Sequence, residues 1–171
     1  MIDSSAVINL SNVDALFLLR SLPGREFCVT QTVVDECWPT CGEELAIEIA
    51  TDGLSVVDDA HIDTARFLDL LDTHSLGRGE TESIVACEKL GLALCCDDKR
   101  ARSLAHKLLG HGRVAGTIAV LRWSVADMIA APEAAYAMYR EMRAKGGFLP
   151  DLRQSEFVMP KIHLSRVHGT D

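Results

Sequence analysis

Apolar residues recur along the chain in two alternating forms, short continuous runs and longer stretches with helical spacing. The short runs, typical of buried strands, fall near residues 1–2, 26–30, 54–57, 92–96 and 114–115. The longer stretches, typical of amphipathic helices, fall near residues 6–19, 31–38, 43–51, 60–71, 80–90, 100–109, 118–129 and 132–143. Because helices and strands alternate, the pattern predicts an α/β fold.

Glycine and proline mark several of the expected boundaries. The helix that begins at Gln31 is expected to stop before Pro39, because proline disfavours α geometry in the residue ahead of it. Gly91 suits the position just after a helix C-terminus. The continuously apolar run 92–96 that follows is expected to form a central parallel strand.

Length and composition indicate a single domain. A chain of 171 residues with 48% apolar residues can bury a sizeable core without further help. Only 5% of the residues are aromatic, which favours aliphatic packing between helices and strands over a β-sandwich. We expect the domain to span residues 1–150 and a polar tail to cover residues 151–171.

Charge and hydropathy limit the cellular setting and the partners. The formal net charge of −8 argues against general coating of nucleic acid, so any such binding must be local. No apolar run approaches the roughly 20 residues that cross a bilayer. The first residues carry an acid, Asp3, and no basic stretch of the kind that opens a signal peptide. We therefore expect a cytoplasmic protein without a membrane association.

The six cysteines lie mostly inside apolar stretches. In a chain of this size they are expected to be reduced residues of the core rather than disulfide partners. Cys37 and Cys41 have a spacing that also occurs in zinc sites. No second pair of cysteines or histidines with matching spacing follows, which disfavours a structural zinc.

Acidic residues fall where strands are expected to end or helices to begin. Asp3 and the Asp97-Asp98 pair follow apolar runs, whereas Glu36, Glu80 and Glu82 lie on predicted helices. In an open parallel sheet, ligands bind beyond the carboxyl ends of the strands. Carboxylates that converge there repel one another unless a hard cation lies between them. Oxygen ligands suit Mg²⁺ or Mn²⁺, which can activate water and neutralise charge during phosphodiester cleavage.

Taken singly, each of these acids has an ordinary structural explanation. An aspartate at a strand end can form a turn or cap a helix, and glutamates in a first helical turn favour the helix dipole. Lys99, Arg100 and Arg102 directly follow Asp97-Asp98. They could hold a substrate phosphate at the rim of the site, or they could pair with the acids on a solvated helix face.

The order of five short motifs resembles the PIN-domain proteins. The motifs are Asp3-Ser-Ser, Val33-Val-Asp-Glu36, Gly79-Glu-Thr-Glu-Ser-Ile84, Leu94-Cys-Cys-Asp-Asp-Lys-Arg-Ala-Arg102 and Gly116-Thr117. The variant with a GE-x-E-x-I segment and a strand ending in DD-x-x-AR, related to VapC-type toxins, is the most similar. The resemblance covers roughly residues 1–125.

The resemblance implies a three-layer α/β/α fold around a central, mostly parallel sheet, with a Mg²⁺ or Mn²⁺ site. Asp3 then corresponds to the first metal acid and Glu36 to the second. The third acid is Glu80 or Glu82, and the fourth is Asp97 or Asp98. We favour Glu80 and Asp97 in the metal's own shell. Hydroxyls near the site correspond to Thr117 together with Ser4 or Ser5.

The function implied is that of a metal-dependent endoribonuclease, a hydrolase that cleaves single-stranded RNA, as the toxin of a toxin–antitoxin pair. VapC-type toxins commonly dimerise and bind a small antitoxin that covers the site. One alternative is an inactive PIN-like module that only docks RNA or a protein. Another is a phosphatase-like enzyme with a nucleophilic Asp3, for which a second aspartate would be expected where Ser5 stands.

Overall fold

Residues 1–3 lie between two small parallel sheets and hydrogen-bond to both. In this computed structural model, which describes residues 1–157, β1 (Cys28–Val29) pairs with β2 (Ser55–Val56) and β3 (Leu94–Cys95) pairs with β4 (Val114–Ala115). The amide of Ile2 donates to the Cys28 carbonyl at 2.8 Å. On the other side, the amide of Asp3 donates to the Cys95 carbonyl at 2.9 Å. The N-terminal segment therefore ties the two sheets together.

The fold is a mostly helical α/β arrangement, and the single central sheet expected from the resemblance is not seen within the described residues. Each paired strand is two residues long, although the apolar runs that predicted them are longer. The first run is only Met1-Ile2, because Asp3 is already the N-cap of the first helix. Ile2 consequently forms an isolated parallel bridge with Cys95 rather than a strand between the two sheets.

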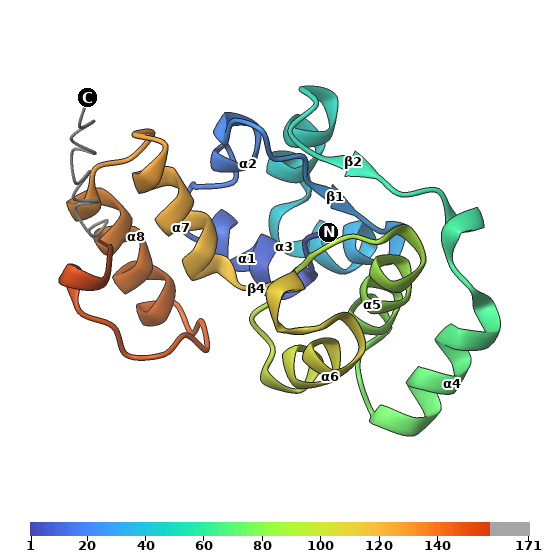
Figure 1. Cartoon of the computed structure of the whole chain (residues 1–171). Helices are drawn as coiled ribbons and strands as arrows, with labels where there is room; N and C mark the ends of the chain where they lie inside the picture. The colour runs from blue at the N-terminus through green and yellow to red at the C-terminus, as the bar shows by residue number, and fades with distance from the viewer. Residues whose placement is uncertain (158–171) are drawn as a thin grey trace, which may run out of the picture.

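Helices surround the two sheets (Figure 1). The α-helices are α1 (Ser4–Ser11), α2 (Leu18–Ser21), α3 (Gln31–Ala50), α4 (Thr64–His74), α5 (Arg78–Leu90), α6 (Lys99–Leu109), α7 (Thr117–Ala126) and α8 (Pro132–Ala144). Short 3₁₀ helices are η1 (Asp59–His61), η2 (His111–Arg113) and η3 (Gln154–Phe157). Helix α1 packs against α3 and α7, and α5 packs against α3, α4 and α6. The candidate acids therefore come from elements that contact one another.

Two helix boundaries differ from the sequence expectation. The helical pattern toward Leu19 is broken after α1, where Asp14 adopts a left-handed conformation with φ 54°. Helix α3 continues past Pro39, where the sequence predicted its end, and kinks at Cys41 with φ −145° and ψ 29°. The element therefore consists of two helical segments joined at this kink, and the break lies two residues after Pro39, because proline removes a backbone donor and bends a helix.

The core consists of two clusters of buried side chains. The larger cluster joins α1, α3, α7 and α8, and it includes Leu10, Leu45 and Tyr139. The smaller one joins α5, α6 and β3 around Ile84 and Leu94. All six cysteines are free thiols, and five of them are buried. Aliphatic side chains dominate both clusters, as the composition predicted.

The C-terminal part of the described chain packs on α7 and α8. Phe157, in η3, is buried against the rings of Tyr136 and Tyr139. The tail predicted over residues 151–171 is described only to residue 157, and residues 158–171 lie outside the described part. Among residues 1–157, no helix is long and apolar enough to span a bilayer.

Replacing Ile2 by Ala tests the link between the two sheets. The Ile2 side chain is fully buried at the bridge to Cys95, so its loss leaves a cavity that the backbone hydrogen bonds prevent from closing. We expect Ile2→Ala to lower the free energy of unfolding by about 2–5 kcal/mol in urea denaturation. The control Met128→Ala, at a side chain that is 91% exposed, should change it by less than about 0.5 kcal/mol. Equal effects of the two substitutions would contradict the central role of this link.

Candidate functional site

Asp3 is a buried carboxylate with one satisfied oxygen and one unsatisfied oxygen. Its side chain is 0% exposed. Oδ2 accepts hydrogen bonds from the Ser5 hydroxyl at 3.0 Å and the Cys96 thiol at 3.3 Å. Oδ1 is buried and has no hydrogen-bond partner. Burial raises the pKa of Asp3 above its ordinary value of 3.8, and the hydrogen bonds only partly offset this rise.

Glu80 brings a second carboxylate to the same region from the start of α5. Its Oε2 accepts a hydrogen bond from the Gly77 amide at 2.8 Å, which caps the helix. Burial raises the pKa of Glu80, and the negative charges of Asp3, Asp98 and Glu36 raise it further. Three other acids therefore lie close enough to disfavour the charged form of Glu80.

Glu36 reaches this region from α3. Its Oε1 accepts a hydrogen bond from the Gly79 amide at 3.0 Å. A side chain at position 79 would push the Glu36 carboxylate aside, so glycine leaves room for this contact. The glycine before Glu80 thus allows α3 and α5 to present their glutamates side by side.

Asp97 follows β3 and is held by three protein donors. Its carboxylate accepts from the Asn9 side-chain amide at 2.8 Å, the Thr117 amide at 2.9 Å and the Thr117 hydroxyl. Its own amide donates to the Ser5 hydroxyl at 3.0 Å. Asp97 therefore joins α1, β3 and the start of α7. Both of its oxygens already have protein partners.

Asp98 has a different arrangement, because it is the N-cap of α6. Its Oδ1 accepts from the amides of Arg100 and Ala101 at 2.7 and 2.8 Å. This is the ordinary capping role that a strand-end aspartate can have. Its charge nevertheless acts on Glu80, so Asp98 also faces the acidic region.

Glu82 does not share the orientation of Glu80. Two residues apart on a helix, their side chains project roughly 200° from each other. Glu82 is only partly exposed, and its Oε2 is buried without a hydrogen-bond partner. Of the two glutamates offered by the GE-x-E-x-I segment, Glu80 is the one that joins the other acids.

The predicted hydroxyl and basic residues surround these acids unevenly. Ser5 and Thr117 contact Asp3 and Asp97 respectively, whereas the carbonyl of Ser4 lies 4.0 Å from the Cys37 thiol. Lys99 and Arg100 are exposed at the start of α6, and Arg102 donates to the Cys96 carbonyl at 3.3 Å. Within residues 1–157, none of these three cations forms an ion pair with Asp97 or Asp98.

The acids suit a hard divalent cation in kind, but they are not arranged as a finished metal site. Asp3 Oδ1 is a buried acceptor without a donor, and repulsion from three other carboxylates acts on Glu80. Carboxylate oxygens are the ligands that Mg²⁺ and Mn²⁺ prefer. In the described part of the chain, however, no three acidic, histidine or cysteine side chains form a group that could hold an ion as they stand.

Two contacts at this site were missed by the sequence analysis. Asn9 lies in the apolar stretch of α1, and its amide orients Asp97. A polar residue inside an apolar helix is a signal that could have identified it, because buried amides need partners. Cys96, assigned to the core, also donates its thiol to Asp3, and nothing in its sequence context indicates this contact.

Comparison with known families agrees with this arrangement. A family model described as a PIN domain (DUF3368) matches residues 1–159, and the chain belongs to this PIN domain family. PIN domains are often nucleases and typically bind metal. Searches among curated proteins and among solved structures found no match.

Asp3→Asn tests whether the buried carboxylate of Asp3 lowers the free energy of unfolding. Because burial raises the pKa of Asp3 in the folded state, the folded protein holds this proton more tightly than the unfolded chain. The metal-free protein should therefore lose stability as the pH rises from about 4 through the raised pKa. In EDTA, Asp3→Asn should stabilise the protein against urea at pH 7 and have less effect at pH 4.

Mn²⁺ completes this test. At about 100 times its dissociation constant, an ion bound only by the folded state adds about 2.7 kcal/mol to the free energy of unfolding. The parent protein should show this gain at pH 7, and Asp3→Asn should lose most of it. If the free energy of unfolding of the parent protein changed neither with pH between 4 and 7 nor with Mn²⁺, Asp3 would not be a metal ligand held at a raised pKa.

Proposed function

We propose that this protein is a Mg²⁺- or Mn²⁺-dependent endoribonuclease that hydrolyses phosphodiester bonds of single-stranded RNA. The observation that carries the proposal is the buried Asp3 carboxylate, whose Oδ1 has no hydrogen-bond donor. Its charge, together with those of Glu36 and Asp98, raises the pKa of Glu80. Within the described residues, none of these four acids is paired with a lysine or arginine. Mutual repulsion of this kind is relieved by a hard cation, which supports metal-dependent cleavage over a purely structural role.

The residues divide into those that would hold an ion and those that position them. Asp3, Glu36 and Glu80, with the free oxygen of Asp98, are the metal acids of the proposal. A bound Mg²⁺ or Mn²⁺ would lower the pKa of a water nucleophile and neutralise charge on the phosphodiester. Asn9 and Thr117 hold the Asp97 carboxylate between α1 and α7. In this role Asp97 fixes the geometry of the strand end from which Asp98 projects.

A cavity beside these acids has room for a substrate. It has a volume of about 910 Å³, and its lining includes Ser5, Asn9, Glu80, Asp97 and Asp98. Lys99 and Arg100 line the same cavity. They can neutralise the phosphates on either side of the cleaved bond, which agrees with local binding of RNA by an acidic protein.

One observation favours the alternative of an inactive PIN-like binding module. Both oxygens of Asp97 accept hydrogen bonds from protein donors, so this acid is held in place without an ion. An inactive scaffold would take up no Mn²⁺ through its carboxylates. Calorimetric titration with Mn²⁺ therefore separates the two functions, because only the nuclease should show binding that Asp3→Asn removes.

The biological setting rests on the family resemblance alone. A VapC-type toxin would form a homodimer and bind a small antitoxin that covers the acids. Light scattering on the purified protein tests the dimer. Co-expression with the product of a neighbouring small gene tests the antitoxin.

Cleavage of an unstructured RNA tests the proposed activity directly. With Mn²⁺ present, we expect Asp3→Asn and Glu36→Gln each to lower the cleavage rate about 100-fold or more, because each removes a negative ligand of the ion. Asp35→Asn is the matched control. Asp35 lies next to Glu36 on α3 but is exposed and accepts a hydrogen bond from Gln31 at 2.8 Å. This control should cleave at the parent rate.

Two outcomes would overturn the proposal. The first is a parent protein that does not cleave RNA with either Mg²⁺ or Mn²⁺. The second is cleavage by Asp3→Asn or Glu36→Gln at the parent rate, which would point to a contaminating nuclease. Circular dichroism of each variant excludes loss of the fold as the cause of any loss of rate.

A further inference from the structure

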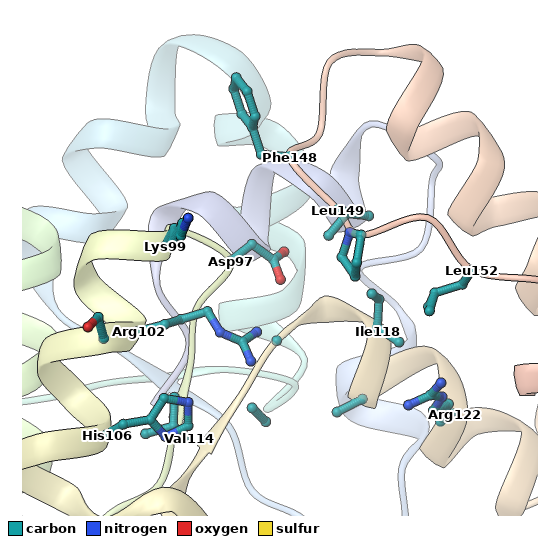
Figure 2. A pocket seen from close by; sticks show the side chains of 15 residues that line it. Asp97, Lys99, Arg102, His106, Val114, Ile118, Arg122, Phe148, Leu149 and Leu152 are labelled. Carbon is teal, nitrogen blue, oxygen red and sulfur yellow. The ribbon is translucent and has the colours of Figure 1, made fainter.

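A second cavity adjoins the acidic one on the other side of Asp97. It has a volume of about 810 Å³ and lies between α6, β4, α7 and the loop after α8 (Figure 2). The two cavities share five lining residues, Asp97, Lys99, Phe148, Leu149 and Pro150. They are therefore two halves of one groove that passes the candidate site.

The second cavity has a basic lining. Its charged and titratable side chains are Lys99, Arg102, His106 and Arg122, with Asp97 as its one acid within the described residues. Figure 2 shows Arg102 reaching from α6 toward the space in front of α7. Arg122 approaches from the α7 side, with Glu156 3.9 Å away. In a protein with a net charge of −8, this local excess of cations is suited to phosphates.

Phe148 belongs to the lining of both cavities and is 94% exposed. Its ring points outward from the other labelled cavity residues (Figure 2). Its backbone is fixed by its neighbours. The Gly147 amide donates to the Met142 carbonyl at 2.9 Å, and the Tyr139 hydroxyl donates to the Pro150 carbonyl at 2.6 Å. Leu149 is buried beneath the loop. An anchored loop therefore holds an exposed aromatic residue at the edge of a cavity that Arg102 and Arg122 also line.

The loop is also connected to the candidate site. A side chain at position 147 would meet the Asn9 side chain and the Met142 carbonyl within 3 Å. With glycine at position 147, the Asn9 side chain can lie against this loop and still donate its amide hydrogen to Asp97. Single exposed apolar residues such as Met128 are common on protein surfaces. Phe148 differs because its position is fixed relative to Asp97.

We propose that the groove between α6 and α7 binds the unpaired nucleotides that flank the cleaved bond, with one base stacked on Phe148. Phosphates of this segment contact Lys99, Arg102 and Arg122. The inference rests on the proposed ribonuclease function and adds a binding subsite to it. Aromatic rings and arginines together are typical of single-strand binding, and a duplex cannot offer an unstacked base to Phe148. Phe148 thereby selects unpaired RNA.

Binding of a fluorescent octauridylate to the full chain tests this subsite by anisotropy, in EDTA so that no cleavage occurs. Phe148→Ala should weaken binding about 10-fold, the effect expected for loss of one stacked base. Phe148→Trp should retain the parent affinity, and the equally exposed control Met128→Ala should not change it. Arg102→Ala should lower the slope of log affinity against log salt by about one phosphate contact. A duplex of the same length should not distinguish Phe148→Ala from the parent.

The proposal is overturned if Phe148→Ala binds the single strand within twofold of the parent, or if the parent binds none. It is also overturned if Phe148→Ala leaves RNA binding unchanged but alters the oligomeric state, since a second copy would then occupy the groove. This binding test is independent of cleavage. A chain that binds RNA through Phe148 but cleaves none would overturn the ribonuclease function, whereas a chain that cleaves RNA with Phe148→Ala binding normally would overturn only the subsite.

Discussion

The backbone of residues 1–3 is the constraint on which the rest of the structure depends. Hydrogen bonds from Ile2 to Cys28 and from Asp3 to Cys95 join the two small sheets across this segment. The segment then turns directly into α1, whose first free amides are partly satisfied by the Asp3 carbonyl. Because the chain changes from bridge to helix at Asp3, its carboxylate is buried at the junction of both sheets. The most central acid is thus fixed by backbone geometry rather than by its own side-chain contacts.

The electrostatics of the site follow from this burial. Asp3 has one oxygen without a donor, and Glu80 is repelled by Asp3, Asp98 and Glu36. Asp97 is linked to Asp3 through the Ser5 hydroxyl, and both of its carboxylate oxygens accept hydrogen bonds from Asn9 or Thr117. The Asp97 carboxylate therefore has hydrogen-bond donors for both oxygens, whereas Asp3 has one oxygen without a donor. An arrangement that only stabilised the fold would have paired the buried Asp3 instead, since an unpaired buried carboxylate costs free energy. A bound cation would supply the partner that Asp3 Oδ1 lacks.

Sequence patterns predicted the helices, the strand positions and the acids at the strand ends, because these depend on local spacing and on where apolar runs stop. They did not predict the length of the strands, which depends on backbone pairing between distant segments such as Ile2 and Cys95. Pro39 correctly indicated a break within residues 31–50, although the break lies at Cys41, two residues later. Helix geometry separates Glu80 from Glu82 once the start of α5 is known, but the GE-x-E-x-I segment alone left them equivalent. The apolar context of Asn9 marks it as a buried polar residue, but its partner Asp97 lies 88 residues away, so no local pattern could identify that partner.

Asn9 also explains how an acidic protein can hold a polyanion close to a cluster of carboxylates. Its amide donates a hydrogen bond to one oxygen of Asp97, and Gly147 packs against the same side chain. Glu80 and Asp98 line the cavity on one side of Asp97, whereas Arg102 and Arg122 line the cavity on the other side. Lys99 and Phe148 contribute to both cavities. A strand that follows the groove would pass from the basic half to the acidic half at Asp97, so that its flanking phosphates gain attraction before the cleaved bond meets the carboxylates. Net charge alone would argue against RNA, but its distribution along this groove favours it.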